Sequence, residues 1–97
     1  DTYGPFTSWL MKEHNFTAQD IARVCSYNPG KFINEFQDER YGEVKEGFVG
    51  SLTIRSMEGS NPILRSHLKT KCGWSPFEGL EFPGKKIMTI IKGKIYE

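Results

Sequence analysis

The stretch Lys71–Gly79, KCGWSPFEG, constrains the backbone of this chain more tightly than its flanking segments do. Its two glycines permit backbone conformations that other residues avoid, and Pro76 fixes one backbone angle. Trp74 and Phe77 offer large apolar side chains that can anchor the stretch to a core. These residues predict a rigid, packed loop between two β-rich segments.

Strand patterns lie on both sides of this loop. Residues 52–57 alternate as a half-buried strand does, and residues 87–97 contain two β-rich runs around Lys92-Gly93, a pattern typical of a hairpin with a tight turn. A shorter strand is expected around Val44. Residues 58–64 contain Gly, Ser, Asn and Pro, which predicts a surface loop.

Helix patterns precede the strands. Apolar residues at helical spacing predict a first helix over Pro5–His14, with Gly4 at its cap and Asn15 as its stop. A short third helical turn is expected through Phe32, and residues 34–40 read as a polar connector.

The second helix has the best local start signal, and we expect it over Ala18–Tyr27. Thr17 can cap the amide three residues on, and Asp20 complements the positive helix end. Asn28-Pro29 is expected to end the helix, because the residue before proline avoids the α region. We expect the buried face to contain Ile21, Val24 and Cys25.

The predicted fold class is α+β, with two to three short helices followed by a small, mostly antiparallel β-sheet. We place a helical segment at 1–40 and a β-rich segment at 41–97. So few strands form a thin sheet, which usually needs further strands or helices to cover its apolar face. We therefore expect the missing cover to lie in a larger protein.

Composition excludes several classes of protein. The chain has 97 residues, enough for one small domain and too few for a large catalytic barrel. Its net charge of +1 creates no global field that would attract nucleic acid or an anionic membrane, and no apolar run reaches the roughly 18 residues of a membrane span. We expect a solvated strand edge to contain Lys85, Lys86, Lys92 and Lys94.

The two cysteines and the start of the chain give expectations about the cellular compartment and about the length of the protein. Cys25 and Cys72 have neither the density of a disulfide scaffold nor the spacing of a zinc site, which favours a cytoplasmic protein. The chain starts at Asp1 without an initiator Met or a recognisable signal peptide. We expect it to be a piece of a longer protein.

The residues capable of chemistry are scattered. His14 and His67 are the only histidines, and neither lies in a metal-binding pattern. Cys72 follows a lysine that could lower its pKa, but a base and an oxyanion site are not evident, so we expect a packing role. Cys25 is expected to be inert.

Other candidate residues also have simple structural interpretations. Ser75 lacks the flanking pattern of a nucleophile elbow, and Asp38-Glu39 read as a solvated turn. The glycines at 42, 47 and 50 are too scattered for a phosphate-binding loop. Two interpretations are open for four aromatic residues: they form a core, or they form an exposed surface that binds a partner. These residues are Trp9, Trp74, Phe77 and Phe82.

Four stretches carry a resemblance to a known family. Lys71–Gly79 resembles the C-terminal signature of the dihydroorotases, metal-dependent cyclic amidohydrolases of pyrimidine synthesis. Residues 1–10 resemble the start of the last barrel helix in that family, and residues 21–32 resemble the helix and Asn-Pro turn that leave the barrel. Residues 42–53 are similar to a strand pair with the pattern Gly-x-Ile-x-x-Gly-x-x-Ala-Asp-Leu. Gly50-Ser51 replaces the Ala-Asp, which leaves dihydropyrimidinases, hydantoinases and allantoinases open.

The resemblance implies a parent enzyme that reversibly cyclises N-carbamoyl-aspartate to dihydroorotate, with zinc activating a water. In that family the metal ligands lie on barrel strands upstream of the position matching Asp1. We therefore assign no catalytic, cofactor-binding or metal residue in this chain. The implied partners are the barrel and N-terminal strands of the parent, with weak self-association as a further expectation.

Two alternatives stay open at this point. The chain could be a non-catalytic interaction or assembly domain that kept an amidohydrolase tail and lost the chemistry. It could also be a small enzyme that uses Cys72 or His67.

Overall fold

The computed structural model describes residues 2–97 and contains helices followed by a small sheet. Its elements, in chain order, are the helices α1 (Tyr3–Glu13) and α2 (Ala18–Ala22), the π-helical turn η1 (Arg23–Tyr27), the helix α3 (Asn28–Ile33), the strand β1 (Leu52–Pro62), the 3₁₀ turn η2 (Arg65–His67) and the strands β2 (Glu81–Ile91) and β3 (Lys94–Tyr96). The strands form one sheet in the order β1-β2-β3. The predicted α+β class is therefore confirmed. Within residues 2–97, no helix has the length and apolar content needed to cross a membrane.

The chain divides into two compact units. The first unit comprises Asp1–Asn15 and Arg55–Ile87, and the second comprises Phe16–Ile54 and Met88–Glu97. Each unit thus combines residues from both sides of the predicted boundary between 40 and 41. That boundary stays a prediction.

The first helix starts earlier than its sequence pattern predicts. Thr2 is the N-cap of α1, so Gly4 lies inside the first turn and the prediction that it caps the helix is wrong. Gly4 lies beside the Arg55 side chain, since a Cβ at this position would lie 2.6 Å from Nη1 of Arg55. Asn15 follows the helix with a φ of 58°, which confirms the predicted stop.

The core of the first unit is aromatic. Phe82 is 4% exposed, and its ring lies 5.5 Å from that of Phe77 and 6.5 Å from that of Phe6. Trp9 joins the same cluster at 5.5 Å from Phe6. Such tilted and edge-to-face rings add to the stabilisation that area burial provides.

The strand β1 continues through residues that the sequence assigns to a loop. It extends to Pro62, so the predicted surface loop over 58–64 is wrong for most of its length. Long-range pairing continues beyond it, since the Ile63 amide donates to the Leu80 carbonyl at 2.9 Å and the Gly79 amide donates to the Ile63 carbonyl at 3.0 Å. These backbone bonds outweigh the local turn preference of Gly, Ser, Asn and Pro.

The second unit begins with a capped helix. The Asp20 amide donates to the Thr17 hydroxyl at 3.1 Å, and the Thr17 amide donates to the Asp20 carboxylate at 2.9 Å. This reciprocal pair is a capping box and confirms the predicted start.

The capping carboxylate gives a pH prediction. Hydrogen bonds from the Thr17 amide and hydroxyl, with a contribution from Arg23, lower the pKa of Asp20 below its usual value of 3.8. A carboxyl whose pKa is depressed on folding stabilises the fold above its unfolded pKa, and that contribution disappears as the pH falls through the lower folded value. An NMR titration should therefore give Asp20 a pKa below 3.8, and Thr17→Val should raise it. A value at or above 3.8 in the unmodified chain would contradict the cap.

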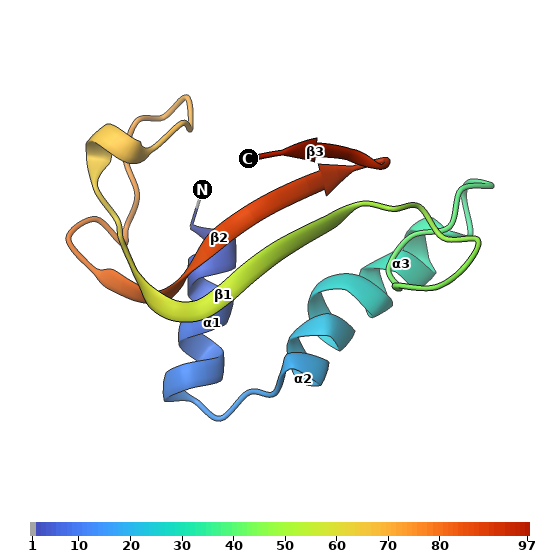
Figure 1. Cartoon of the computed structure of the whole chain (residues 1–97), viewed down its shortest axis with the longest axis horizontal. Coiled ribbons are helices and arrows are strands. Elements are labelled where there is room, and N and C mark those ends of the chain that lie inside the picture. Colours follow the sequence, from blue (N-terminus) through green and yellow to red (C-terminus); the bar gives the residue numbers. More distant parts are fainter. Residues whose placement is uncertain (1) are drawn as a thin grey trace. The chain divides into compact units, whose positions relative to one another are not determined.

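The helical run continues past Asn28-Pro29, where the sequence predicts an end. Asn28 has helical angles, and its amide donates to the Arg23 carbonyl, five residues back, in the π-helical turn η1. Pro29 then occupies the first turn of α3, where its missing amide costs no helical hydrogen bond. The predicted stop is wrong, whereas the predicted third turn through Phe32 is confirmed (Figure 1).

The face of the helical run that was expected to be buried is largely exposed to solvent. Val24 is 49% exposed, and Ile21 and Cys25 are only half-buried. The prediction of a buried face within this chain is therefore wrong. The apolar spacing is nevertheless that of a helix that packs against another surface.

The segment between α3 and β1 has no strand around Val44. This residue is 85% exposed, and the only regular pairing of the segment among residues 2–97 is a parallel bridge between Arg40 and Phe48. The predicted strand is wrong, because one apolar residue between charged neighbours has no partner strand. The predicted polar connector over residues 34–40 is confirmed.

The C-terminal hairpin forms as its sequence predicts. Strands β2 and β3 pair antiparallel, with Ile91 opposite Lys94, and Figure 1 shows β3 turning back beside the end of β2. Lys92 and Gly93 both have positive φ, 48° and 82°, as a two-residue type I′ turn requires.

Candidate functional site

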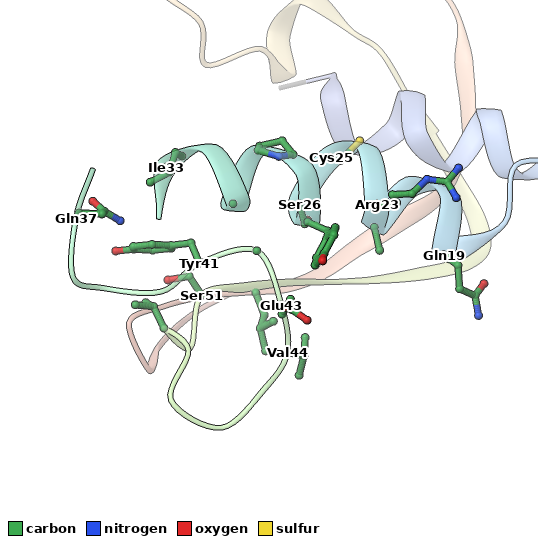
Figure 2. Close-up of a pocket in the computed structure, with 17 residues that line it drawn as sticks. Gln19, Arg23, Cys25, Ser26, Ile33, Gln37, Tyr41, Glu43, Val44 and Ser51 are labelled. Atoms are coloured by element: carbon green, nitrogen blue, oxygen red, sulfur yellow. The ribbon is translucent and has the colours of Figure 1, made fainter. Parts of the chain in front are cut away.

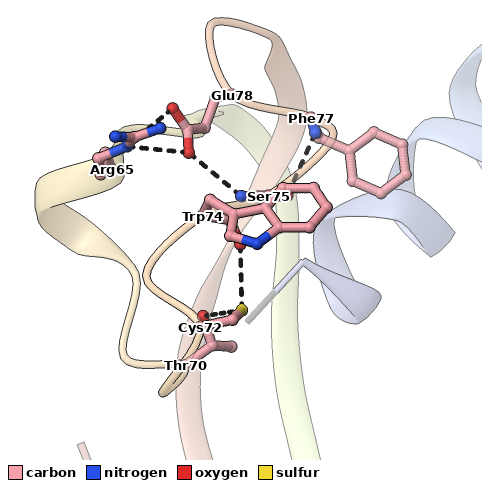
Figure 3. A network of polar contacts seen from close by, with 7 residues as sticks. All are labelled: Arg65, Thr70, Cys72, Trp74, Ser75, Phe77 and Glu78. Atoms are coloured by element: carbon pink, nitrogen blue, oxygen red, sulfur yellow. Dashed lines mark hydrogen bonds and ion pairs between the residues drawn. The ribbon is translucent and has the colours of Figure 1, made fainter.

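The loop Lys71–Gly79 is held by one carboxylate (Figure 3). Glu78 accepts a hydrogen bond from the Ser75 amide at 3.2 Å and pairs with Nε of Arg65, also at 3.2 Å. The Ser75 hydroxyl in turn accepts from the Phe77 amide at 3.2 Å. The predicted loop is present and is held by these hydrogen bonds, but most of its residues are exposed, so the prediction that it is packed is wrong for most of its length. Its rigidity stays a prediction. Ser75 serves the turn and has no neighbouring base among these contacts.

The two aromatic residues of the loop have different environments. Phe77 packs into the aromatic cluster, stacking on Phe6 at 5.8 Å, while Trp74 is 57% exposed. The prediction that both anchor the loop is therefore right for Phe77 and wrong for Trp74. The backbone of a turn directs side chains three residues apart to different sides, so their spacing alone does not decide which one packs into the cluster.

Cys72 is exposed, so its predicted packing role is wrong. A hydrogen bond between the Thr70 hydroxyl and Sγ, 3.5 Å apart, lowers the pKa of the thiol, and the backbone of Trp74 adds to this effect. Cys25 is half-buried on the helical run. The two cysteines lie in different units.

The histidines have separate structural surroundings. His14 caps α1 and its ring lies 4.4 Å from the ring of Trp9, whereas His67 ends the short turn η2 and is exposed. Residues 2–97 contain no group of three or more His, Cys, Asp or Glu side chains that could hold a metal ion. The side chains present thus do not fit a zinc site.

Glu39 joins the connector to the hairpin turn. Its carboxylate accepts from Nζ of Lys92 at 3.0 Å and from the Tyr41 hydroxyl at 2.8 Å. These bonds lower the pKa of Glu39 and raise the pKa values of Tyr41 and Lys92. All three side chains are solvated, so the network positions the turn and resembles no catalytic dyad. Asp38 is exposed, as its turn assignment predicts.

A hollow lies in each unit. The hollow in the first unit, of about 530 Å³, lies beside Trp9, His14 and Glu81. The hollow in the second unit is larger, about 830 Å³, and lies between the helical run and residues 41–52. Sequence reasoning missed both. For the larger hollow the sequence offers one hint, Val44, an apolar residue in a charged segment.

Comparison with known proteins connects these features to a family. No family model matches the chain. It is 39% identical over 79 residues to the dihydroorotase of Pyrococcus furiosus, which is 81% of this chain and 18% of that protein. It is 30% identical over 89 residues to the dihydroorotase of Methanosphaera stadtmanae, which is 89% of this chain and 20% of that protein. It is also 32% identical over 89 residues to the multifunctional protein pyr1-3 of Dictyostelium discoideum, 89% of this chain and 4% of that protein. The chain thus spans about a fifth of the length of the curated dihydroorotases it matches.

Proposed function

The chain is part of a dihydroorotase-like protein, and we propose that it serves there as a structural C-terminal piece without the catalytic centre. The observation that carries the proposal is the identity of 30–39% over 79–89 residues with dihydroorotases that are about five times longer. The resemblance of Lys71–Gly79 to the C-terminal signature of the family supports the same placement.

We propose that the whole protein catalyses the reversible hydrolysis of dihydroorotate to N-carbamoyl-aspartate in pyrimidine biosynthesis, in the cytoplasm. Zinc would supply an activated water for this reaction. Its ligands would come from the remainder of the protein, because residues 2–97 offer no suitable cluster of side chains. This chain's own contribution is to pack against that remainder.

The first test is a chimera. This chain replaces the matched segment of the Methanosphaera stadtmanae dihydroorotase, chosen because that match covers 89% of the chain. We expect the chimera to hydrolyse dihydroorotate within about tenfold of the unmodified relative, since a structural segment contributes little to the transition state. The same relative without the segment is the control and should lose its activity.

The free chain provides the second half of this prediction. It should not hydrolyse dihydroorotate and should contain less than about 0.1 zinc per chain after purification without chelator, because its histidines are separate. A folded but inactive chimera would contradict the structural role. About one tightly bound zinc in the free chain would contradict the absence of a catalytic centre.

A further inference from the structure

The hollow of the second unit has two walls (Figure 2). The helical run of α2, η1 and α3 forms one wall, and the segment over residues 41–52 forms the other, with Tyr41 and Val44 among its lining residues. Its apolar lining comes mainly from Ala22, Tyr27, Ile33, Val44, Val49 and Leu52.

The apolar side chains of the hollow are poorly covered. Val44 is 85% exposed, and Tyr27 and Ile33 are each more than 40% exposed. Contiguous exposed apolar surface of this kind marks a contact site. Arg23 at the rim already pairs with Asp20 at 3.1 Å, so the lining suits an apolar occupant better than an anionic small molecule.

The walls are fixed before anything binds. Gly30 on α3 and Gly42 touch so closely that a Cβ on Gly30 would lie 2.5 Å from the Tyr41 carbonyl oxygen. The Asn34 side chain bonds both the amide and the carbonyl of Tyr41, at 2.9 and 3.0 Å. These contacts hold the segment against the helix at one end, so the hollow is part of the folded unit. A preformed surface lowers the entropic cost of binding.

The length of the relatives indicates what covers the hollow. The matched dihydroorotases extend over about five times the length of this chain, so most of such a protein lies outside the structure. We propose that the hollow between the helical run and residues 41–52 receives an apolar segment from the remainder of the same dihydroorotase-like protein, with Val44 at the centre of the contact. This inference rests on the proposed function and names the surface through which the chain performs it.

The test compares one substitution in two settings. Val44→Asp should leave the thermal unfolding of the free chain unchanged, because the side chain is in water there. In the chimera the same substitution places a carboxylate in an apolar contact, and we expect the unfolding midpoint to fall by about 5 °C or more. Val44→Ile should retain the midpoint. Lys45→Asp puts the same carboxylate on the adjacent exposed residue, which does not line the hollow. It removes the contact of Lys45 Nζ with the Phe48 ring, and it should therefore lower the midpoints of the free chain and of the chimera by the same small amount.

Three results would overturn the inference. Val44→Asp could be no more harmful than Lys45→Asp in an active chimera, which would show that the hollow stays open while the proposed function holds. Val44→Asp could destabilise the free chain as much as the chimera, which would show that the Val44 side chain stabilises the second unit itself. The free chain could form a dimer in analytical ultracentrifugation that Val44→Asp dissociates, which would make a second copy the occupant. An inactive unmodified chimera contradicts the proposed function instead, so the two failures are distinguishable.

Discussion

Replacing Phe82 by alanine should destabilise the chain by about 3–5 kcal/mol, the usual cost of deleting a buried aromatic side chain. Phe82 is 4% exposed and contacts the rings of Phe6, Trp9 and Phe77, with centroids between 5.5 and 6.5 Å away. Deleting the ring removes its apolar burial and leaves a cavity in the main cluster of the first unit. Denaturant unfolding followed by circular dichroism measures the loss.

Trp74→Ala is the matched control for the aromatic cluster. The indole is 57% exposed, so its deletion should cost less than about 1 kcal/mol, in the range of surface substitutions. A large loss of stability for Trp74→Ala would show that the cluster is assigned to the wrong ring of the Lys71–Gly79 loop. A small loss for Phe82→Ala would show that the Phe82 ring is not at the centre of the cluster.

The second large effect is expected at Gly30. A Cβ there would lie 2.5 Å from the Tyr41 carbonyl oxygen and 2.7 Å from Cα of Gly42, and both atoms belong to the backbone. Alanine is normally favoured over glycine inside a helix, yet overpacking against fixed atoms should outweigh that gain. We expect Gly30→Ala to destabilise the chain by about 2–3 kcal/mol in denaturant unfolding.

Gly50→Ala is the control for this substitution. A Cβ at Gly50 meets one atom, at 3.9 Å, so the change should stay within about 0.5 kcal/mol. If Gly30→Ala proved neutral or stabilising, the close contact between α3 and the segment after it would be absent in solution, and the hollow would have no fixed walls.

The candidate site could be predicted only in part from the sequence. The nine residues of Lys71–Gly79 indicated both a rigid loop and a family, and the comparisons bear out the family. The hollow could not be found in the same way. Its walls are formed by residues 19–33 and 41–52. The contact between Gly30 and Gly42 joins the two walls, and no local sequence pattern predicts it.

The features that the sequence by itself determined are those whose partners lie within a few residues. The Thr17–Asp20 capping box and the Lys92-Gly93 turn each form from neighbouring groups with one favourable geometry, so their residues suffice to predict them.

The tertiary structure decided what local preference could not. Residues 58–62 join β1 although they resemble a loop, and the chain stays helical through Asn28-Pro29 because η1 shifts the hydrogen bonds to carbonyls five residues back. It also decided that Phe77 packs, half-buried, into the aromatic cluster and that Trp74 is exposed. For the strand and for the two aromatic rings, the outcome depends on which distant backbone or side chain is available, and the packed arrangement of the chain sets that. At Asn28-Pro29 the hydrogen bonds are local, but their five-residue spacing differs from the α-helical spacing on which the predicted stop relied.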